Sequence, residues 1–195
     1  MKNFVITGYS RSGTLFLATN MNLSKKWMVS HATGGYDDLR KNSIEFIQQR
    51  LNKDYYGEVN DYLRYYILKL NVSKKALILR DPADIWISMS NRKKQKLWNG
   101  VLIDLENAYN EFANLIKSDI RFILFDRMIT DLKYLKGIFS YVGIDDVKVT
   151  KEMQMKKINE NEGEIKYRCL SDFDTSIQNR IIKIRDIYME MKNAV

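Results

Sequence analysis

The stretch FVITGYSRSGTLFLATN, residues 4–20, decides the fold class of this chain. Residues 4–7 form a short apolar, β-branched run that predicts a buried strand, and residues 12–23 have the apolar spacing of a helix. Between them, Gly8 and Gly13 frame a loop. Such a loop directs backbone N–H groups at one place, and the helix N-terminus behind it adds partial positive charge. The stretch therefore predicts a phosphate-binding site.

The loop differs from the one that ATP-hydrolysing proteins use. Its spacing, Gly8-x-x-x-x-Gly13, matches the first half of a Walker A motif, but Thr14-Leu15 stands where Lys-Ser or Lys-Thr would be. The cation is instead Arg11, inside the loop. Because the missing hydroxyl is the group that normally holds magnesium, we expect a phosphate-bearing ligand that is handled without a metal ion.

Two later stretches add to this pattern. KKALILRDPADIWISMSNR, residues 74–92, predicts a strand ending in Arg80 and a helix that carries Ser88, with Asp81 as its cap and Pro82 in its first position. FILFDRMITDLKYLKGIFSYVGID, residues 122–145, predicts a strand over 122–125 and a helix over 132–142 that ends at a glycine.

In this order and spacing, the three stretches resemble the sulfotransferases that use 3′-phosphoadenosine 5′-phosphosulfate (PAPS). The sequence R-S-G-T at residues 11–14 is similar to the family's 5′-phosphosulfate-binding loop. Arg80 and Ser88 match its 3′-phosphate motif, and residues 122–145 resemble its later strand, helix and F-x-x-x-G-[IL] ending. The resemblance covers about half of the chain and is loose over the C-terminal part.

The resemblance implies an enzyme that transfers a sulfuryl group from PAPS to a hydroxyl or amine, leaving 3′-phosphoadenosine 5′-phosphate (PAP), with no metal ion. Arg11 would stabilise charge on the leaving phosphate, and Arg80 with Ser88 would hold the 3′-phosphate. The residues implied to bind the cofactor are Ser10, Arg11, Ser12, Gly13, Thr14, Arg80 and Ser88. Phe125 or Trp27 is expected to stack on the adenine or to lie in the core.

A general base is expected to take the acceptor's proton. His31 is the only histidine, follows a predicted strand over residues 27–30, and has an unperturbed pKa of about 6.5. The alternative is that His31 has only a structural role, as a partly buried side chain that hydrogen-bonds to the backbone of a loop. Glu58, near the end of a weak predicted strand over 55–59, is the rival base or else a carboxylate that positions Asn60 or Arg64. A helix over residues 61–70, with Asp61 near its N-cap, is expected to follow. We favour His31, because its strand should lie beside the strand of the phosphate loop.

Composition fits one domain over residues 1–195, which we expect to be an α/β three-layer sandwich with a central parallel sheet. The formal charge of +8 suits a polyanionic nucleotide. Aromatic residues lie in apolar patterns and not among the cations, which does not favour nucleic-acid binding. The single Cys169, the absence of a visible leader and the lack of an apolar run of membrane-spanning length predict a cytoplasmic protein.

The acceptor is left open as a small molecule, a glycan or a peptide. Residues 31–60, with a turn at Asp37 and Asp38, and residues 92–100 are expected to shape its entrance. The family's late Arg-Lys-Gly loop has no clear counterpart; the nearest cations are Lys156, Lys157, Lys166 and Arg168. Two other functions stay open: a P-loop kinase of a nucleotide or small molecule, and a non-catalytic nucleotide-binding module.

Overall fold

A computed structural model describes residues 2–31, 44–92, 99–155 and 166–195. The chain divides into two compact units, and each is built from two separate segments. The first unit comprises Met1–Ile78 and Asp119–Ile158, and the second comprises Leu79–Ser118 and Asn159–Val195. The first unit carries the sheet, and the second is helical. That the units together form one domain stays a prediction.

The first unit is built on a five-stranded sheet with the strand order β2-β3-β1-β4-β5. Strand β1 lies at its centre and pairs in parallel with β3 and β4, while β2 pairs in parallel with β3. The strands are β1 (Asn3–Gly8), β2 (Met28–His31), β3 (Tyr56–Val59), β4 (Lys74–Leu79) and β5 (Arg121–Leu124). Because neighbouring strands run in the same direction, their carboxyl ends meet at one edge of the sheet and their amino ends at the other.

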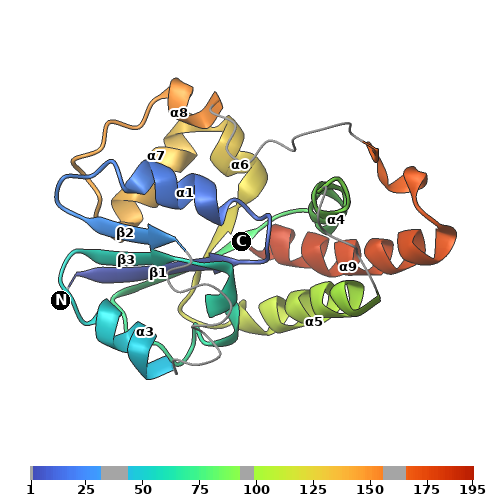
Figure 1. Ribbon diagram of the computed structural model, residues 1–195, viewed down its shortest axis with the longest axis horizontal. Coiled ribbons are helices and arrows are strands. Elements are labelled where there is room, and N and C mark those ends of the chain that lie inside the picture. The colour runs from blue at the N-terminus through green and yellow to red at the C-terminus, as the bar shows by residue number, and fades with distance from the viewer. Residues whose placement is uncertain (1, 32–43, 93–98, 156–165) are drawn as a thin grey trace. The chain divides into compact units, whose positions relative to one another are not determined.

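Helices cover both faces of this sheet. Figure 1 shows α1, α6 and α7 over one face, with α8 beyond them, and α3 below the other. Their bounds are α1 (Thr14–Met21), α3 (Ile44–Leu51), α6 (Phe125–Thr130), α7 (Leu132–Val142) and α8 (Lys151–Met155). The expected α/β class, a parallel sheet between helical layers, is confirmed.

The buried strand β1 organises the core of the first unit. All of its residues are buried, as the apolar run predicts for a strand covered on both faces. The ring of Phe4 crosses β3 at Gly57, where an added Cβ would lie 2.1 Å from the Phe4 Cζ atom. Gly57 pairs with Phe4 in the β1–β3 register. Only a residue without a side chain therefore lets this ring pack beside its own neighbouring strand.

The second unit consists of helices α4 (Pro82–Ser90), α5 (Asn99–Leu115) and α9 (Thr175–Ala194), with a short 3₁₀ turn η2 (Leu170–Asp172). Helix α9 packs against both α4 and α5. Two ion pairs reinforce this packing: Arg185 with Asp81 at 2.9 Å, and Arg180 with Glu106 at 2.8 Å. As predicted, Asp81 caps α4, accepting a hydrogen bond from the Ala83 N–H at 2.8 Å, and Pro82 opens the helix.

The sequence-based prediction was wrong in one element. Residues 61–70 were expected to form an α-helix, but the structure has only the 3₁₀ helix η1 (Asp61–Tyr65). The Asn60 side chain caps it by accepting from the Tyr62 N–H, one position earlier than the expected cap at Asp61. The strand predicted over 122–125 is confirmed as β5, which ends at Leu124, one residue before the expected end, and Phe125 begins helix α6.

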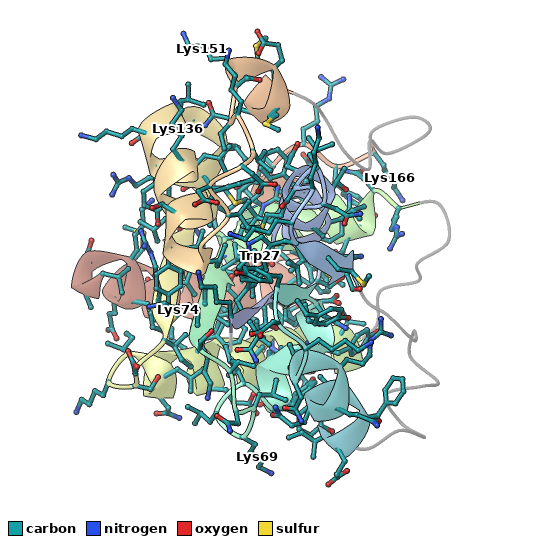
Figure 2. All side chains as sticks on the ribbon, turned by 90° about the vertical axis from the view of Figure 1, so that its left-hand side faces the viewer. Trp27, Lys69, Lys74, Lys136, Lys151 and Lys166 are labelled. Carbon is teal, nitrogen blue, oxygen red and sulfur yellow. The ribbon has the colours of Figure 1, made fainter. Side chains whose placement is uncertain are left out.

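Trp27 is a core residue and not an adenine-stacking one. Its side chain is 4% exposed and packs against Phe4 and Tyr55, with ring centroids 5.2 and 5.5 Å away. The indole N–H donates to the Gly143 carbonyl at 3.2 Å, so α7's end is joined to the segment before β2. Figure 2 shows Trp27 near the middle of the side on which the strands begin.

The close approach of Phe4 to Gly57 predicts an asymmetric response to added methyl groups. We expect Gly57→Ala to lower the free energy of unfolding by about 2 kcal/mol or more, because the new Cβ overlaps the Phe4 ring. Gly137→Ala is the control: it lies within α7, and its Cβ would meet nothing nearer than 3.9 Å. That change should raise the free energy of unfolding by about 0.5–1 kcal/mol. Urea denaturation measures both, and equal effects would contradict the packing described.

Candidate functional site

The loop between β1 and α1 has the backbone of an anion-binding turn. Arg11 has a φ of 68° and Gly13 a φ of 97°, both in the left-handed region. The Ser12 N–H donates to the Tyr9 carbonyl at 3.0 Å and closes the turn between them. Left-handed residues within such a turn direct neighbouring N–H groups into a shared concavity. A non-glycine residue with this φ is strained, and such strain gathers at ligand-binding sites.

Close packing holds this loop in place. A Cβ on Gly8 would lie 2.3 Å from the Ser12 hydroxyl and 3.0 Å from the Ile78 carbonyl oxygen. A Cβ on Gly13 would lie 2.8 Å from the Phe125 ring. Both glycines that frame the loop are therefore required, the first by strand β4 and the loop itself, the second by helix α6. This contact also gives Phe125 a place: it begins α6 and lies against the loop.

The loop fits a phosphate group. Ser12 is fully buried, and its hydroxyl has no hydrogen-bond partner among the described residues. A buried hydroxyl left without a partner costs about 1–3 kcal/mol, so a ligand oxygen there would be favourable. Gly13 caps α1 without a side-chain hydrogen bond, which leaves the first N–H groups of the helix for a ligand. Thr14 begins the helix with a buried side chain, and Ser10 and Arg11 are half-buried.

His31 lies beside this loop. It is the last residue of β2, and its Nε2 atom is 3.3 Å from the Thr14 Oγ1 atom. Burial lowers the pKa of His31 below its ordinary value of 6.5, an effect that the negative charges of Asp61 and Glu58 partly offset. The imidazole is therefore neutral, and able to accept a proton, over a wider pH range than a free histidine. The structure brings His31 to the loop from a separate strand; its role as a base stays a prediction.

Glu58 lies within β3 and not after it, and its side chain is engaged. It is 4% exposed, with the Tyr56 hydroxyl donating to Oε2 at 2.9 Å and the Asn60 amide to Oε1 at 3.4 Å. In the sheet, Glu58 is opposite Ser30, one residue before His31. This geometry favours the alternative reading of Glu58 as a carboxylate that positions its neighbours, Asn60 among them. Its role as a base stays a prediction.

Arg64 is a residue near the loop whose site role the sequence did not single out. It is 9% exposed, and its guanidinium carbon lies 4.9 Å from the ring centroid of Tyr9 and 4.3 Å from that of Tyr65. Its Nη1 donates to the Asp61 carbonyl at 3.0 Å and its Nη2 to the Tyr65 hydroxyl at 2.6 Å. Arg64 thus fixes Tyr9, the first residue of the loop after Gly8. The sequence feature that could have pointed to Arg64 is a single cation among the tyrosines of residues 61–66.

In the second unit, Arg80 and Ser88 lie at opposite ends of α4. Arg80 directly precedes the capping residue Asp81, and Ser88 stands in the helix's last turn; both are half-buried. The Tyr109 hydroxyl donates to the Arg80 carbonyl. Burial raises the pKa of Tyr109 well above its ordinary value, so this hydroxyl stays a donor. The backbone at Arg80 is therefore held from α5, as well as by the strand that ends before it.

Several residues that the sequence analysis named fall outside the described part of the chain. They are the turn at Asp37 and Asp38 and two of the late cations, Lys156 and Lys157. Lys166 and Arg168 are described and exposed, with their backbone N–H groups bonded to Asn91 and Asp172. Within the described ranges, no group of three or more His, Cys, Asp or Glu side chains is placed to hold a metal ion. No helix of those ranges is both long and apolar enough to cross a bilayer.

Comparison with solved structures places this fold among sulfotransferases. The chain is similar to a sulfotransferase from Alicyclobacillus acidocaldarius, with a TM-score of 0.60 and 11% sequence identity over 100% of this chain and 95% of that one. It is also similar to mouse sulfotransferase SULT7A1 complexed with PAP, with a TM-score of 0.57 and 15% identity over 98% and 88% of the two chains. No protein-family model and no curated protein sequence matches the chain. At these identities the likeness establishes a sulfotransferase-like fold.

Proposed function

We propose that this protein is a PAPS-dependent sulfotransferase, which transfers a sulfuryl group to a hydroxyl or amine of an acceptor. One observation carries the proposal: a strained, glycine-framed loop with Arg11 inside it leads into α1, and His31 approaches that loop to 3.3 Å. The fold is one that sulfotransferases have, and one of them is complexed with PAP. A cytoplasmic location stays a prediction.

The loop residues are proposed to hold the 5′-phosphosulfate. PAPS supplies the activated sulfuryl group, which leaves a phosphate behind. The protein's part is to stabilise the negative charge that grows on that phosphate. Arg11 supplies the cation, and the N-terminus of α1 with the hydroxyls of Ser10, Ser12 and Thr14 supplies hydrogen-bond donors. The left-handed backbone at Arg11 and Gly13 prepares these donors before any ligand arrives.

Arg80 and Ser88 are proposed to bind the 3′-phosphate. A planar guanidinium can make two parallel hydrogen bonds to a phosphate, and a serine hydroxyl can add a third. The bond from Tyr109 to the Arg80 carbonyl supports this role, because it fixes the backbone from which the guanidinium extends.

His31 is proposed to accept the acceptor's proton. It is neutral over most of the physiological pH range because burial lowers its pKa. Thr14 lies next to its Nε2 atom, so the ring stands at the start of α1, where the loop delivers its N–H groups. Glu58 and Asp61 both favour the protonated imidazole electrostatically. They would therefore stabilise the cation that forms when the proton arrives.

The assignment of Arg80 predicts selective binding. Calorimetric titration should show that PAP binds more tightly than ADP, which has no 3′-phosphate. We expect Arg80→Ala to weaken PAP binding by ~2 kcal/mol or more, because a charge-assisted contact is lost. Binding of adenosine 5′-phosphosulfate, which also lacks the 3′-phosphate, should change far less. The control is Lys183→Ala, an exposed cation on α9. Tighter ADP binding would favour a kinase, and equal losses for both ligands would remove Arg80 from the 3′-phosphate site.

The assignment of Arg11 predicts that loss of its guanidinium lowers turnover even when the backbone conformation of the loop is kept. Glycine adopts a positive φ without strain, so Arg11→Gly removes the guanidinium while keeping the loop's conformation. We expect its kcat to fall about 100-fold or more, the scale for losing one donor to developing charge. Arg11→Lys should recover part of that loss. An unchanged kcat with a raised KM in Arg11→Gly would mean that Arg11 binds ground state and transition state alike.

The assignment of His31 predicts a pH profile. Since burial lowers its pKa, kcat/KM should rise with pH through an apparent pKa below 6.5. The same shift favours folding while the ring is neutral. That contribution to stability is present above pH 6.5 and is lost as pH falls through the lowered pKa. His31→Ala should abolish the acidic limb while PAP affinity stays nearly constant. An active His31→Ala beside an inactive Glu58→Gln would transfer the role to Glu58.

A further inference from the structure

The strands of the first unit begin at cations. Lys2 precedes β1, Lys26 stands shortly before β2 and Lys53 before β3, while Lys74 opens β4 and Arg121 opens β5. Because neighbouring strands are parallel, these residues gather at one border of the sheet, which we call the amino edge. Lys25 and Lys75 are the sequence neighbours of Lys26 and Lys74 and add to the positive charge of this edge. The phosphate loop and His31 follow or end strands, so they belong to the opposite border.

Two tyrosines hold these cations in pairs. The Nζ atoms of Lys2 and Lys26 lie 5.6 and 4.8 Å from the ring centroid of Tyr55. Lys74 Nζ and the Arg121 guanidinium carbon lie 5.2 and 4.8 Å from that of Tyr141. Each ring therefore contacts two like charges. Cation–π attraction offsets part of their repulsion, and a negatively charged partner would offset the rest.

The same edge also carries carboxylates, but they are fewer than its cations, and two of them bond to the backbone. Asp119 lies beside Lys74 and Lys75 and offsets part of their charge. Asp146 accepts hydrogen bonds from the Ser24 hydroxyl and from the Lys25 and Lys26 N–H groups, which lower its pKa. Asp54 accepts from the Lys2 N–H at 2.7 Å. The C-terminus of α1, with its partial negative charge, accounts in part for the cations that follow it. The C-terminus of α3 accounts in the same way for Lys53 before β3. Neither helix accounts for the cations before β1 and at the start of β4, so the edge keeps an excess of positive charge.

Exposed apolar side chains accompany the cations. Leu23 is 61% exposed and precedes Lys25, and Met28, also 61% exposed, begins β2. Leu68 is 59% exposed, and its carbonyl accepts a hydrogen bond from Lys75 Nζ at 3.2 Å. Figure 2 looks onto this side of the unit, where Lys69 and Lys136 point outward from the ribbon. Cations and protruding Leu and Met side chains on one border are the combination that binds anionic lipid surfaces.

We propose that the amino edge docks on the surface of an anionic phospholipid bilayer. Lys2, Lys25, Lys26, Lys53, Lys74 and Arg121 would meet lipid phosphates, while Leu23, Met28 and Leu68 enter the headgroup region. Nucleic acid fits less well, because stacking needs open aromatic faces and both tyrosines of this edge are half-buried and covered by cations. The proposal does not depend on sulfuryl transfer. Bound in this way, the first unit would turn its phosphate loop away from the lipid.

Vesicle co-sedimentation of the full chain tests the proposal. The protein should pellet with phosphatidylcholine vesicles that contain phosphatidylserine, and not with phosphatidylcholine alone. Lys53→Glu/Lys74→Glu should lower the partition coefficient at least about 25-fold, because each basic residue at the surface contributes about fivefold. Lys166→Glu/Lys183→Glu has the same net charge, changes exposed lysines of the helical unit, and should retain most of the binding. Circular dichroism melting checks that both variants are folded.

The apolar contribution has its own readout. Leu23→Ser/Met28→Ser should bind at low salt but lose the part of the binding that persists at high salt, where charge is screened. Equal losses in the two lysine variants, or no binding to anionic vesicles, would overturn the proposal. So would tighter binding to a single-stranded oligonucleotide than to vesicles of equal phosphate concentration, if Lys53→Glu/Lys74→Glu abolished it. That last outcome would assign the edge to nucleic acid.

Discussion

The passage of the Phe4 ring across Gly57 is the contact on which the first unit depends. It lets β1 and β3 pair while a large ring fills the space between the sheet and its covering helices. The same ring meets Trp27, which reaches the end of α7 through the Gly143 carbonyl. Because Gly57 has no side chain, the Phe4 ring can connect the central strand, through Trp27, to the end of α7. Because the phosphate loop directly follows β1, the packing of β1 also fixes where the loop begins.

The parallel direction of the strands separates two kinds of chemistry. At the carboxyl ends lie the strained loop, His31 and the Arg64–Tyr9 stack. At the amino ends lie the cations and their tyrosines. Each strand is only a few residues long, so residues at the two borders of the sheet are close in sequence. They nevertheless lie at opposite ends of the strands. The glycine-framed loop and the cation-rich edge therefore lie at opposite borders of the same sheet.

Features set by local patterns were predictable from the sequence. The glycine-framed loop, the Asp81–Pro82 helix start and the glycine end of α7 all follow from backbone preferences, and the structure has each of them. Features set by distant contacts were not. Trp27 looked available for stacking, but the Gly143 carbonyl and Phe4 are its partners. Arg64 could not be placed against Tyr9 from spacing alone, because that contact depends on how η1 folds back over the loop.

The path of the chain through the two units has a consequence for its synthesis. Each unit needs two segments, and the segments alternate along the chain, so the first unit stays incomplete until Asp119–Ile158 has been made. Until then Phe4 and Ile6 lack Leu135, Ile138 and Phe139, which belong to the same core. At about 5–20 residues per second, a ribosome leaves that apolar face uncovered for several seconds. The core of the first unit therefore cannot close until its second segment has been synthesised.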